Sequence, residues 1–242
     1  MAVPAWPRME ELVATAPVHV EVLPVDPAQA ARVLLALQVT TASTLGGLVV
    51  GCGGLLVDHG WLRLLGGGSA LLPDVATVNG IALPGPDVPV DAARPSPPGW
   101  LVVAYDVLGG VYAVDGGLLG VAPGEVCYRG PDALRWVGLG VGHTGLVEAV
   151  LGGALTEFAA DLRWPGWQAE VAAVGADRGL ATYPPPFTFE GRDLSRVSRR
   201  PVPFAELLSF YDDLAGEVRP PRPEGVADDR DDAAAPVGAD RV

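Results

Sequence analysis

The sequence predicts an α+β domain in which an antiparallel meander of short strands packs against helices. In the middle of the chain, short apolar segments alternate with glycine turns such as Gly109-Gly110 and Gly116-Gly117, which is typical of antiparallel hairpins. Beyond residue 142, apolar residues instead recur at the spacing of helices. The length of 242 residues and the hydrophobic content of 49% allow one large core.

The first third of the chain predicts alternating helices and strands. A short helix is expected over 9–16. Asp26 followed by Pro27 predicts a second helix, which ends near Val39, because aspartate caps the first N–H groups and proline fits the first helical position. The strands expected in this part lie over residues 18–23, 47–50, 55–58 and 61–65.

The rest of the body predicts a loop, a meander and a helical half. Residues 66–99 are rich in glycine and proline and are expected to form a long loop. The four strands of the meander are expected over residues 100–106, 111–114, 118–121 and 126–129. The helices that follow are expected over residues 142–151, 155–162, 165–175 and 204–215.

The domain organisation expected from these patterns is a single α+β domain over 9–216 with shorter segments at both ends. Residues 1–8 are expected to be a disordered extension, with Met9 as an alternative translation start. Residues 217–242 contain no aromatic residue and carry seven carboxylates against four arginines, so we expect a disordered acidic tail.

The charge balance excludes several functions. The net charge is −13, and all 16 basic residues are arginine. Without lysine, Schiff-base chemistry and a phosphate loop that needs its lysine are excluded. The acidic balance argues against nucleic acid as a partner. No apolar stretch approaches the roughly 18 residues of a membrane span, and Cys52 and Cys127 have no nearby cysteine partner, so a cytoplasmic location is expected.

No recognised catalytic or metal-binding motif is present. The chain lacks a GxSxG elbow and paired histidine motifs, and His59 follows Asp58 in what we interpret as a tight turn. The glycine clusters at 51–54 and 66–69 lack the GxGxxG spacing and are interpreted as turns. We therefore expect no catalytic residue, no metal and no cofactor.

Asp106 and Asp115 admit two interpretations. They stand on either side of the Gly109-Gly110 turn and would resemble the paired acids of glycosidases if they approached one another. Aspartate beside glycine is also ordinary turn chemistry, which is the interpretation that we favour.

The tryptophans are the most informative residues for function, because indoles are enriched both in cores and at binding hot spots. Arg163 precedes Trp164 and Trp167 closely, so this segment is either a recognition patch or a packed joint between helices. If the protein binds a partner, the residues expected to carry binding are Trp61, Arg63, Asp106, Asp115, Arg163 and Trp164.

Several segments resemble a bacterial family, domain-of-unknown-function family 2625. They include Gly53-Gly-Leu-Leu-Val-Asp-His-Gly-Trp and Asp161-Leu-Arg-Trp-Pro-Gly-Trp, and the resemblance runs from about residue 18 to residue 214. The meander followed by Pro131-Asp-Ala-Leu-Arg-Trp is also similar to the SMI1/KNR4-type (SUKH) superfamily. That second resemblance implies a SUKH-like fold and a domain of the kind that neutralises a toxin by direct binding.

Three functions remain open at this point. The leading expectation is a non-enzymatic protein-binding module, immunity-protein-like, with a protein partner such as a toxin domain. The alternative is a small-molecule or saccharide-binding domain in which tryptophans provide stacking surfaces, and this alternative predicts a concave pocket lined by two or more of them. A hydrolase-type enzyme is third and requires Asp106, Asp115 or His59 to converge in one cleft.

Overall fold

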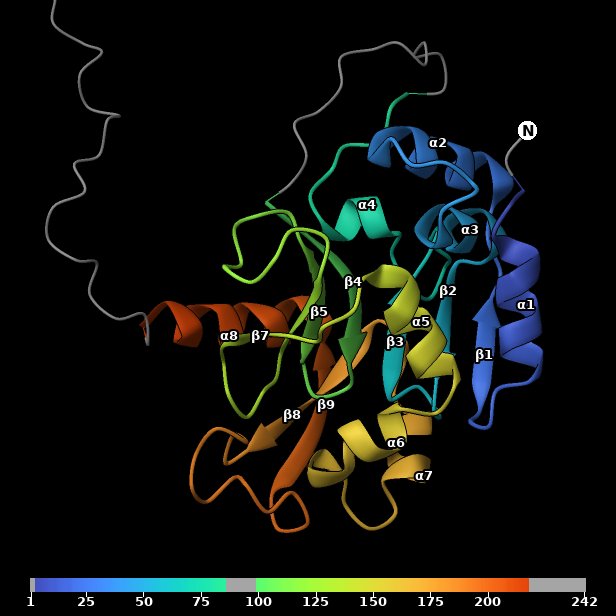
Figure 1. Ribbon diagram of the computed structural model, residues 1–242. Helices are drawn as coiled ribbons and strands as arrows, with labels where there is room; N and C mark the ends of the chain where they lie inside the picture. The colour runs from blue at the N-terminus through green and yellow to red at the C-terminus, as the bar shows by residue number, and fades with distance from the viewer. Residues whose placement is uncertain (1–2, 86–98, 218–242) are drawn as a thin grey trace, which may run out of the picture.

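The computed structural model describes residues 3–85 and 99–217 and contains a seven-stranded antiparallel meander (Figure 1). Each strand pairs with the next one along the chain, so chain order and sheet order are the same. The strands are β1 (Val20–Leu23), β2 (Gly54–Val57), β3 (Leu62–Leu65), β4 (Trp100–Asp106), β5 (Val111–Asp115), β6 (Val126–Arg129) and β7 (Trp136–Gly138). The predicted α+β class with an antiparallel meander is confirmed.

Helices cover both faces of this sheet, and a separate hairpin follows it. The helices are α1 (Trp6–Ala14), α2 (Pro27–Leu37), α3 (Thr44–Gly51), α4 (Val75–Val78), α5 (His143–Leu151), α6 (Leu155–Phe158), η1 (Ala160–Leu162), α7 (Trp167–Ala172) and α8 (Phe204–Glu217). The hairpin consists of β8 (Arg178–Tyr183) and β9 (Ser198–Pro203). None of the described helices is both long enough and apolar enough to cross a bilayer.

Side chains alternate along the strands and supply two separate cores. One core lies between the sheet and the helices α1, α3 and α5, and it includes Leu64, Ala104 and Tyr112. The next residue along β3 and along β4, Leu65 and Tyr105, belongs to a second core, which α2, α4 and α8 cover. Because the side chains of successive strand residues point to opposite faces, the sheet separates these two cores.

The segment expected as a strand over 47–50 is helical instead. Ser43 caps α3, because its hydroxyl accepts a hydrogen bond from the Gly46 N–H at 3.0 Å. A Cβ atom at Gly46 would lie 2.0 Å from the Thr40 oxygen, so glycine permits the close approach of the preceding turn. Close packing and the cap outweigh the low helix propensity of the three glycines in α3.

The expectation that residues 1–8 form a disordered extension is also wrong from Ala5 onward. Helix α1 begins at Trp6 rather than at Met9, and the Ala5 N–H donates to the Thr41 oxygen at 2.8 Å. Trp6 packs closely on Gly51, where any Cβ would overlap the indole. Residues 5–8 therefore belong to the folded structure, because Ala5 bonds to the turn before α3 and Trp6 packs against the first core.

Further differences concern the loops. Residues 118–121 are a loop rather than a strand, because the Asp115 carboxylate accepts backbone hydrogen bonds from this segment and draws it into a turn. The expected loop 66–99 contains the short helix α4, which Asp74 caps, and its residues 86–98 lie outside the described part of the chain, as does the tail beyond residue 217. Strands β7, β8 and β9 were not predicted.

His143, the first residue of α5, makes the stability of the folded protein depend on pH. Both ring nitrogens are buried without a hydrogen-bond partner, and burial lowers the pKa of His143 to about 4 from 6.5. Between these pH values the unfolded chain binds a proton that the folded chain does not, so the free energy of unfolding falls as the pH decreases through this window.

We predict that His143→Phe, which keeps a ring but cannot titrate, flattens the pH dependence of the free energy of unfolding between about pH 6.5 and 4. Urea unfolding of the wild type and of the variant at several pH values measures the difference. Parallel pH profiles for the two proteins would show that His143 is not a buried neutral group.

Candidate functional site

Trp61 and Arg163, two of the predicted binding residues, meet inside the molecule. The Arg163 guanidinium lies over the rings of Trp167 and Trp61, at 4.1 and 5.0 Å from the ring centroids. It also pairs with the Asp58 carboxylate in the turn between β2 and β3, and both of these side chains are 10% exposed. This cluster joins the sheet to α7, so here the guanidinium and the indoles have a packing role.

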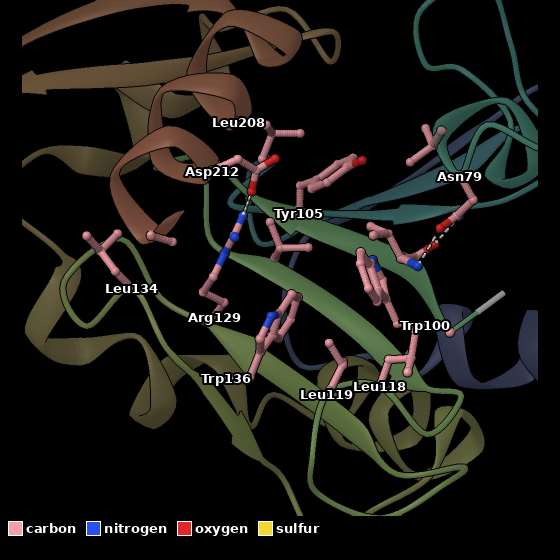
Figure 2. A pocket seen from close by; sticks show the side chains of 15 residues that line it. Asn79, Trp100, Tyr105, Leu118, Leu119, Arg129, Leu134, Trp136, Leu208 and Asp212 are labelled. Carbon is pink, nitrogen blue, oxygen red and sulfur yellow. Dashed lines mark hydrogen bonds and ion pairs between the residues drawn. The ribbon is translucent and has the colours of Figure 1, made fainter. Parts of the chain in front are cut away.

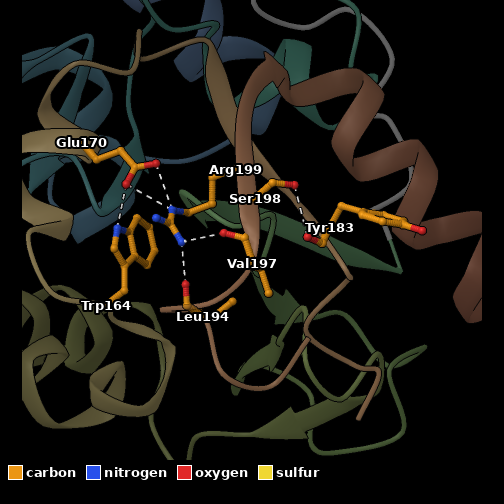
Figure 3. Close-up of polar contacts among 7 residues, drawn as sticks. All are labelled: Trp164, Glu170, Tyr183, Leu194, Val197, Ser198 and Arg199. Atoms are coloured by element: carbon orange, nitrogen blue, oxygen red, sulfur yellow. Dashed lines mark hydrogen bonds and ion pairs between the residues drawn. The ribbon is translucent and has the colours of Figure 1, made fainter. Parts of the chain in front are cut away.

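Trp164 is held in a second network, which Figure 3 shows. The indole N–H donates to the Glu170 carboxylate at 2.7 Å, and the Arg199 guanidinium lies 4.3 Å from the Trp164 ring centroid. Arg199 also donates to Glu170 at 2.9 Å and to the Leu194 backbone oxygen. The network connects β9 to α7, and it uses the polar edge of Trp164 completely.

Asp106 is buried and stabilises the β4–β5 turn. Its carboxylate accepts hydrogen bonds from the Tyr128 hydroxyl at 2.7 Å and from the backbone N–H groups of Leu108 and Gly110 at 2.9 Å each. The pKa of Asp106 is raised, because the effect of burial exceeds the opposing effect of these hydrogen bonds. The turn-forming interpretation of this residue agrees with these contacts.

Asp115 lies at the opposite end of the same hairpin. In the strand register it stands opposite Trp100, whereas Asp106 adjoins the pair formed by Tyr105 and Val111. The backbone N–H groups of the loop after β5, with that of Leu119 first, lower the pKa of Asp115. The two carboxylates therefore do not form the close pair that glycosidase chemistry needs.

Arg63 completes the set of predicted residues and is also enclosed. It is 1% exposed, donates to the Arg178 backbone oxygen at 3.2 Å, and lies over the Phe204 ring at 5.1 Å from its centroid. All six predicted side chains thus make contacts inside the fold. Their part in binding stays a prediction.

The described residues show neither the convergence of Asp106, Asp115 and His59 that the hydrolase hypothesis requires nor a cluster of metal ligands. His59 is exposed in the β2–β3 turn and stacks on His19, and it shares no hydrogen bond or ion pair with Asp106 or Asp115. No group of three or more potential ligands gathers anywhere in 3–85 or 99–217. Both cysteines are free and buried, and burial raises the pKa of Cys52 to about 12.

A cavity of about 840 Å³ lies between the sheet and α8 (Figure 2). Strands β4 to β7 form its floor and the last turns of α8 form its roof, while α4 and the 118–119 loop border it. Two tryptophans line it, Trp100 and Trp136. None of the residues predicted for binding contributes to this cavity.

The strand register places the floor residues on one face. Tyr105, Val111, Arg129 and Trp136 stand directly opposite one another on β4, β5, β6 and β7. Because directly opposed residues of neighbouring strands point to the same side, these four side chains form a row across the sheet. The row runs beneath α8.

A β-bulge brings Trp100 to the same face. The register of β4 and β5 shifts between Val102 and Ala104, and both Val103 and Ala104 belong to the first core. Val102 and Tyr105 therefore both point to the second core, although they are an odd number of residues apart. A regular strand would send Trp100 to the opposite face, so the bulge is the device that lines the cavity with a second indole.

Asn79, which follows α4, holds the bulged strand in place. Its side-chain oxygen accepts a hydrogen bond from the Val102 N–H at 2.7 Å, and its amide group donates to the oxygens of Val102 and Val75 at 2.8 Å each. Strand β3 pairs with β4 only between Leu62–Leu64 and Ala104–Asp106, so at Val102 the Asn79 amide takes the place of the missing neighbouring strand.

The charged groups of the cavity are Arg129 and Asp212. Their side chains are 10% and 60% exposed, and they form an ion pair across the space between β6 and α8. The Arg129 guanidinium also lies over the Trp136 ring at 5.2 Å from its centroid. Burial, and secondarily the charge of Asp212, raises the pKa of Tyr105, so its hydroxyl stays neutral in the cavity.

The sequence did not point to Arg129 and Asp212, and the tryptophans that it favoured, Trp61 and Trp164, are not those that line the cavity. Trp61 and Trp164 are 1% and 4% exposed, whereas Trp100 is 44% exposed. The sequence carries one usable signal for Arg129 and Trp136, since a hairpin from β6 to β7 would oppose them on one face. This signal can be used only if β7 is also predicted, and the sequence did not predict β7.

Comparison with known proteins now adds a family. A family model described as "Protein of unknown function DUF2625" matches residues 1–207. The chain belongs to the DUF2625 family.

Two relatives of this DUF2625 chain are themselves uncharacterised. "Putative uncharacterized protein YbfG" of Escherichia coli (strain K12) is 37% identical over 182 residues, which are 74% of this chain and 79% of the relative. An "Uncharacterized protein" of Haemophilus influenzae is 33% identical over 171 residues, 69% of this chain and 71% of the relative. No solved structure matches. The similarity to the SUKH superfamily stays a prediction.

In this DUF2625 protein, Arg163→Leu should lower the free energy of unfolding by about 3–5 kcal/mol, because the Asp58 carboxylate would be left buried without its partner. Urea unfolding measures this loss. Arg196→Leu is the matched control, since the Arg196–Asp193 pair is 84% and 54% exposed and its loss should change little. Equal effects of the two substitutions would contradict the structural role of Arg163.

Asn79→Ala should lower the free energy of unfolding by about 1–3 kcal/mol, because the N–H and the oxygen of Val102 lose their partners. Asn79→Asp keeps an acceptor for the Val102 N–H but loses the donor, so its effect should be intermediate. The same urea experiment ranks the three proteins, and a wild-type stability for Asn79→Ala would show that the bulge does not need this clamp.

Proposed function

We propose that this DUF2625 protein binds a small organic ligand in the cavity beneath α8, with Trp100 and Trp136 as stacking surfaces. The observation that carries the proposal is that two indoles line one cavity of about 840 Å³. Sites for small molecules are typically apolar hollows of about 300–1,000 Å³ with a few polar groups. This cavity supports the alternative function, which expects a concave pocket lined by two or more tryptophans.

The exposed aromatic surface in the lining supports a ligand with a flat body. Trp100 is 44% exposed although indoles are costly to leave in water, and Leu118 at the same rim is 73% exposed. A ring or a sugar face placed on Trp100 would cover this surface. The bulge and the Asn79 clamp place Trp100 there, and bulges are enriched beside functional sites.

Binding of a protein partner, the leading expectation from the sequence, is a second proposal with a different location. Tyr183 and Phe189 are 76% and 82% exposed, and both belong to the segment that runs from β8 to β9. Exposed aromatic residues are frequent hot spots of protein interfaces, and the net charge of −13 favours a basic partner. An immunity-like role and a cytoplasmic location are the finer form of this proposal.

Ligand-observed NMR with 3-phenylpropan-1-ol and with cellobiose tests the first proposal. We expect at least one of the two probes to bind, and Trp100→Ala to weaken that binding by about tenfold, which corresponds to roughly 1.4 kcal/mol of lost stacking and burial. The matched control is Phe189→Ala, which removes an exposed aromatic side chain that does not line the cavity.

Equal binding by the wild type and by Trp100→Ala would contradict the proposal, and so would a failure to bind by both probes and by the acid and amine that correspond to the alcohol. Binding of the alcohol alone indicates an aromatic or aliphatic ligand, whereas binding of cellobiose alone indicates a saccharide. Loss of a basic partner protein in Phe189→Ala but not in Trp100→Ala would support the second proposal.

A further inference from the structure

We propose that the ligand of this cavity carries a carboxylate, which binds Arg129 in the place that the Asp212 carboxylate occupies in the structure. The inference rests on the proposed ligand-binding function and adds the charge of the ligand to it. Its starting point is that a largely buried guanidinium faces the cavity and that its Nε has no hydrogen-bond partner among the described residues.

Arg129 is under-satisfied for a buried cation. A guanidinium has five N–H donors. Among the residues that the structure describes, its ion-pair partner is Asp212, and the buried Nε of Arg129 has no hydrogen-bond partner. Unpaired donors of a buried charged group are costly. A carboxylate that approaches the guanidinium edge-on can accept two parallel hydrogen bonds, which is the geometry that arginine is shaped to provide.

Asp212 is a weak occupant of this position. Its side chain is 60% exposed on the surface of α8, whereas that of Arg129 is 10% exposed. Water competes for an exposed carboxylate, so Asp212 itself loses little when it leaves the pair. If Asp212 rotates into solvent while a ligand carboxylate takes its place, Arg129 keeps an anionic partner throughout. Asp212 therefore resembles a built-in substitute for the acid group of the ligand.

The same contacts argue against a cationic ligand. The Trp136 ring already has the Arg129 guanidinium over it at 5.2 Å from the centroid, so a second cation there would meet a like charge. Asp212, the carboxylate at the cavity, is already neutralised by Arg129. The net charge of −13 acts at long range and is screened beyond about 8–10 Å at physiological salt, so the local contacts decide.

The arrangement along the cavity gives the rest of the ligand. Figure 2 shows Trp136 beside Arg129, and Trp100 with Leu118 farther from the ion pair. A ligand whose carboxylate reaches Arg129 would lay its body across Trp136 toward Trp100. The geometry thus favours a hydrophobic or aromatic carboxylic acid.

Three probes that share one phenylpropyl body test the inference: 3-phenylpropionate, 3-phenylpropan-1-ol and 3-phenylpropylamine. Titration calorimetry at fixed salt should give the acid an affinity about tenfold or more above that of the alcohol, as expected for hydrogen bonds to a charged group. The amine should bind most weakly. In Asp212→Asn the affinity for the acid should rise several-fold while that for the alcohol stays constant.

Asp213→Asn is the matched control, because Asp213 is the exposed neighbour of Asp212 on α8 and does not line the cavity. It makes the same change in net charge and should leave the affinity for the acid unchanged. In Arg129→Lys, which keeps the charge but loses the fork, the preference for the acid over the alcohol should shrink.

The outcomes separate the two proposals. Equal affinities for acid and alcohol in both the wild type and Asp212→Asn would overturn the carboxylate while leaving the cavity as a binding site. Preference for the amine would likewise overturn it and assign Asp212 to a cationic ligand. Binding of no phenylpropyl probe, together with failure of cellobiose, would overturn the binding function itself.

Discussion

The alternation of side chains between two buried faces of one sheet is the constraint on which this structure depends. Because helices cover both faces, every strand residue has a fixed side, and a shift by one position would exchange the two cores. The bulge in β4 is a local exception that the fold exploits. It leaves both cores filled and turns Trp100 toward the face where α8 leaves space.

Several polar residues that suggested a catalytic or binding role in the sequence stabilise the sheet and its turns in the structure. Asp106 satisfies the backbone of a buried turn, and Asp58 with Arg163 joins the sheet to the helical layer. The function of such charged residues is therefore ambiguous in a sequence, since the same residue types stabilise turns and bind ligands. In this structure the burial of these side chains distinguishes the two roles. The spacing of residues in the sequence does not predict that burial.

The sequence predicts those features that depend on local chemistry. Glycine turns between apolar runs predicted β4, β5 and β6, and the Asp26-Pro27 pair predicted the start of α2. Helix α3 was missed because its residues are apolar on all sides and include glycines, so its pattern has no period. The location and lining of the cavity were missed because they depend on strand register and on one bulge, which bring together residues far apart in the chain.

The cavity draws on Asn79, Trp100, Arg129 and Asp212, residues from four separate stretches of the chain. Such a site has a high contact order, and it is complete only when α8, the last described helix, has docked on the sheet. A molecule that binds there adds its binding free energy to the finished native state alone. Occupancy of the cavity would thus distinguish completely folded chains from those that have formed only the meander.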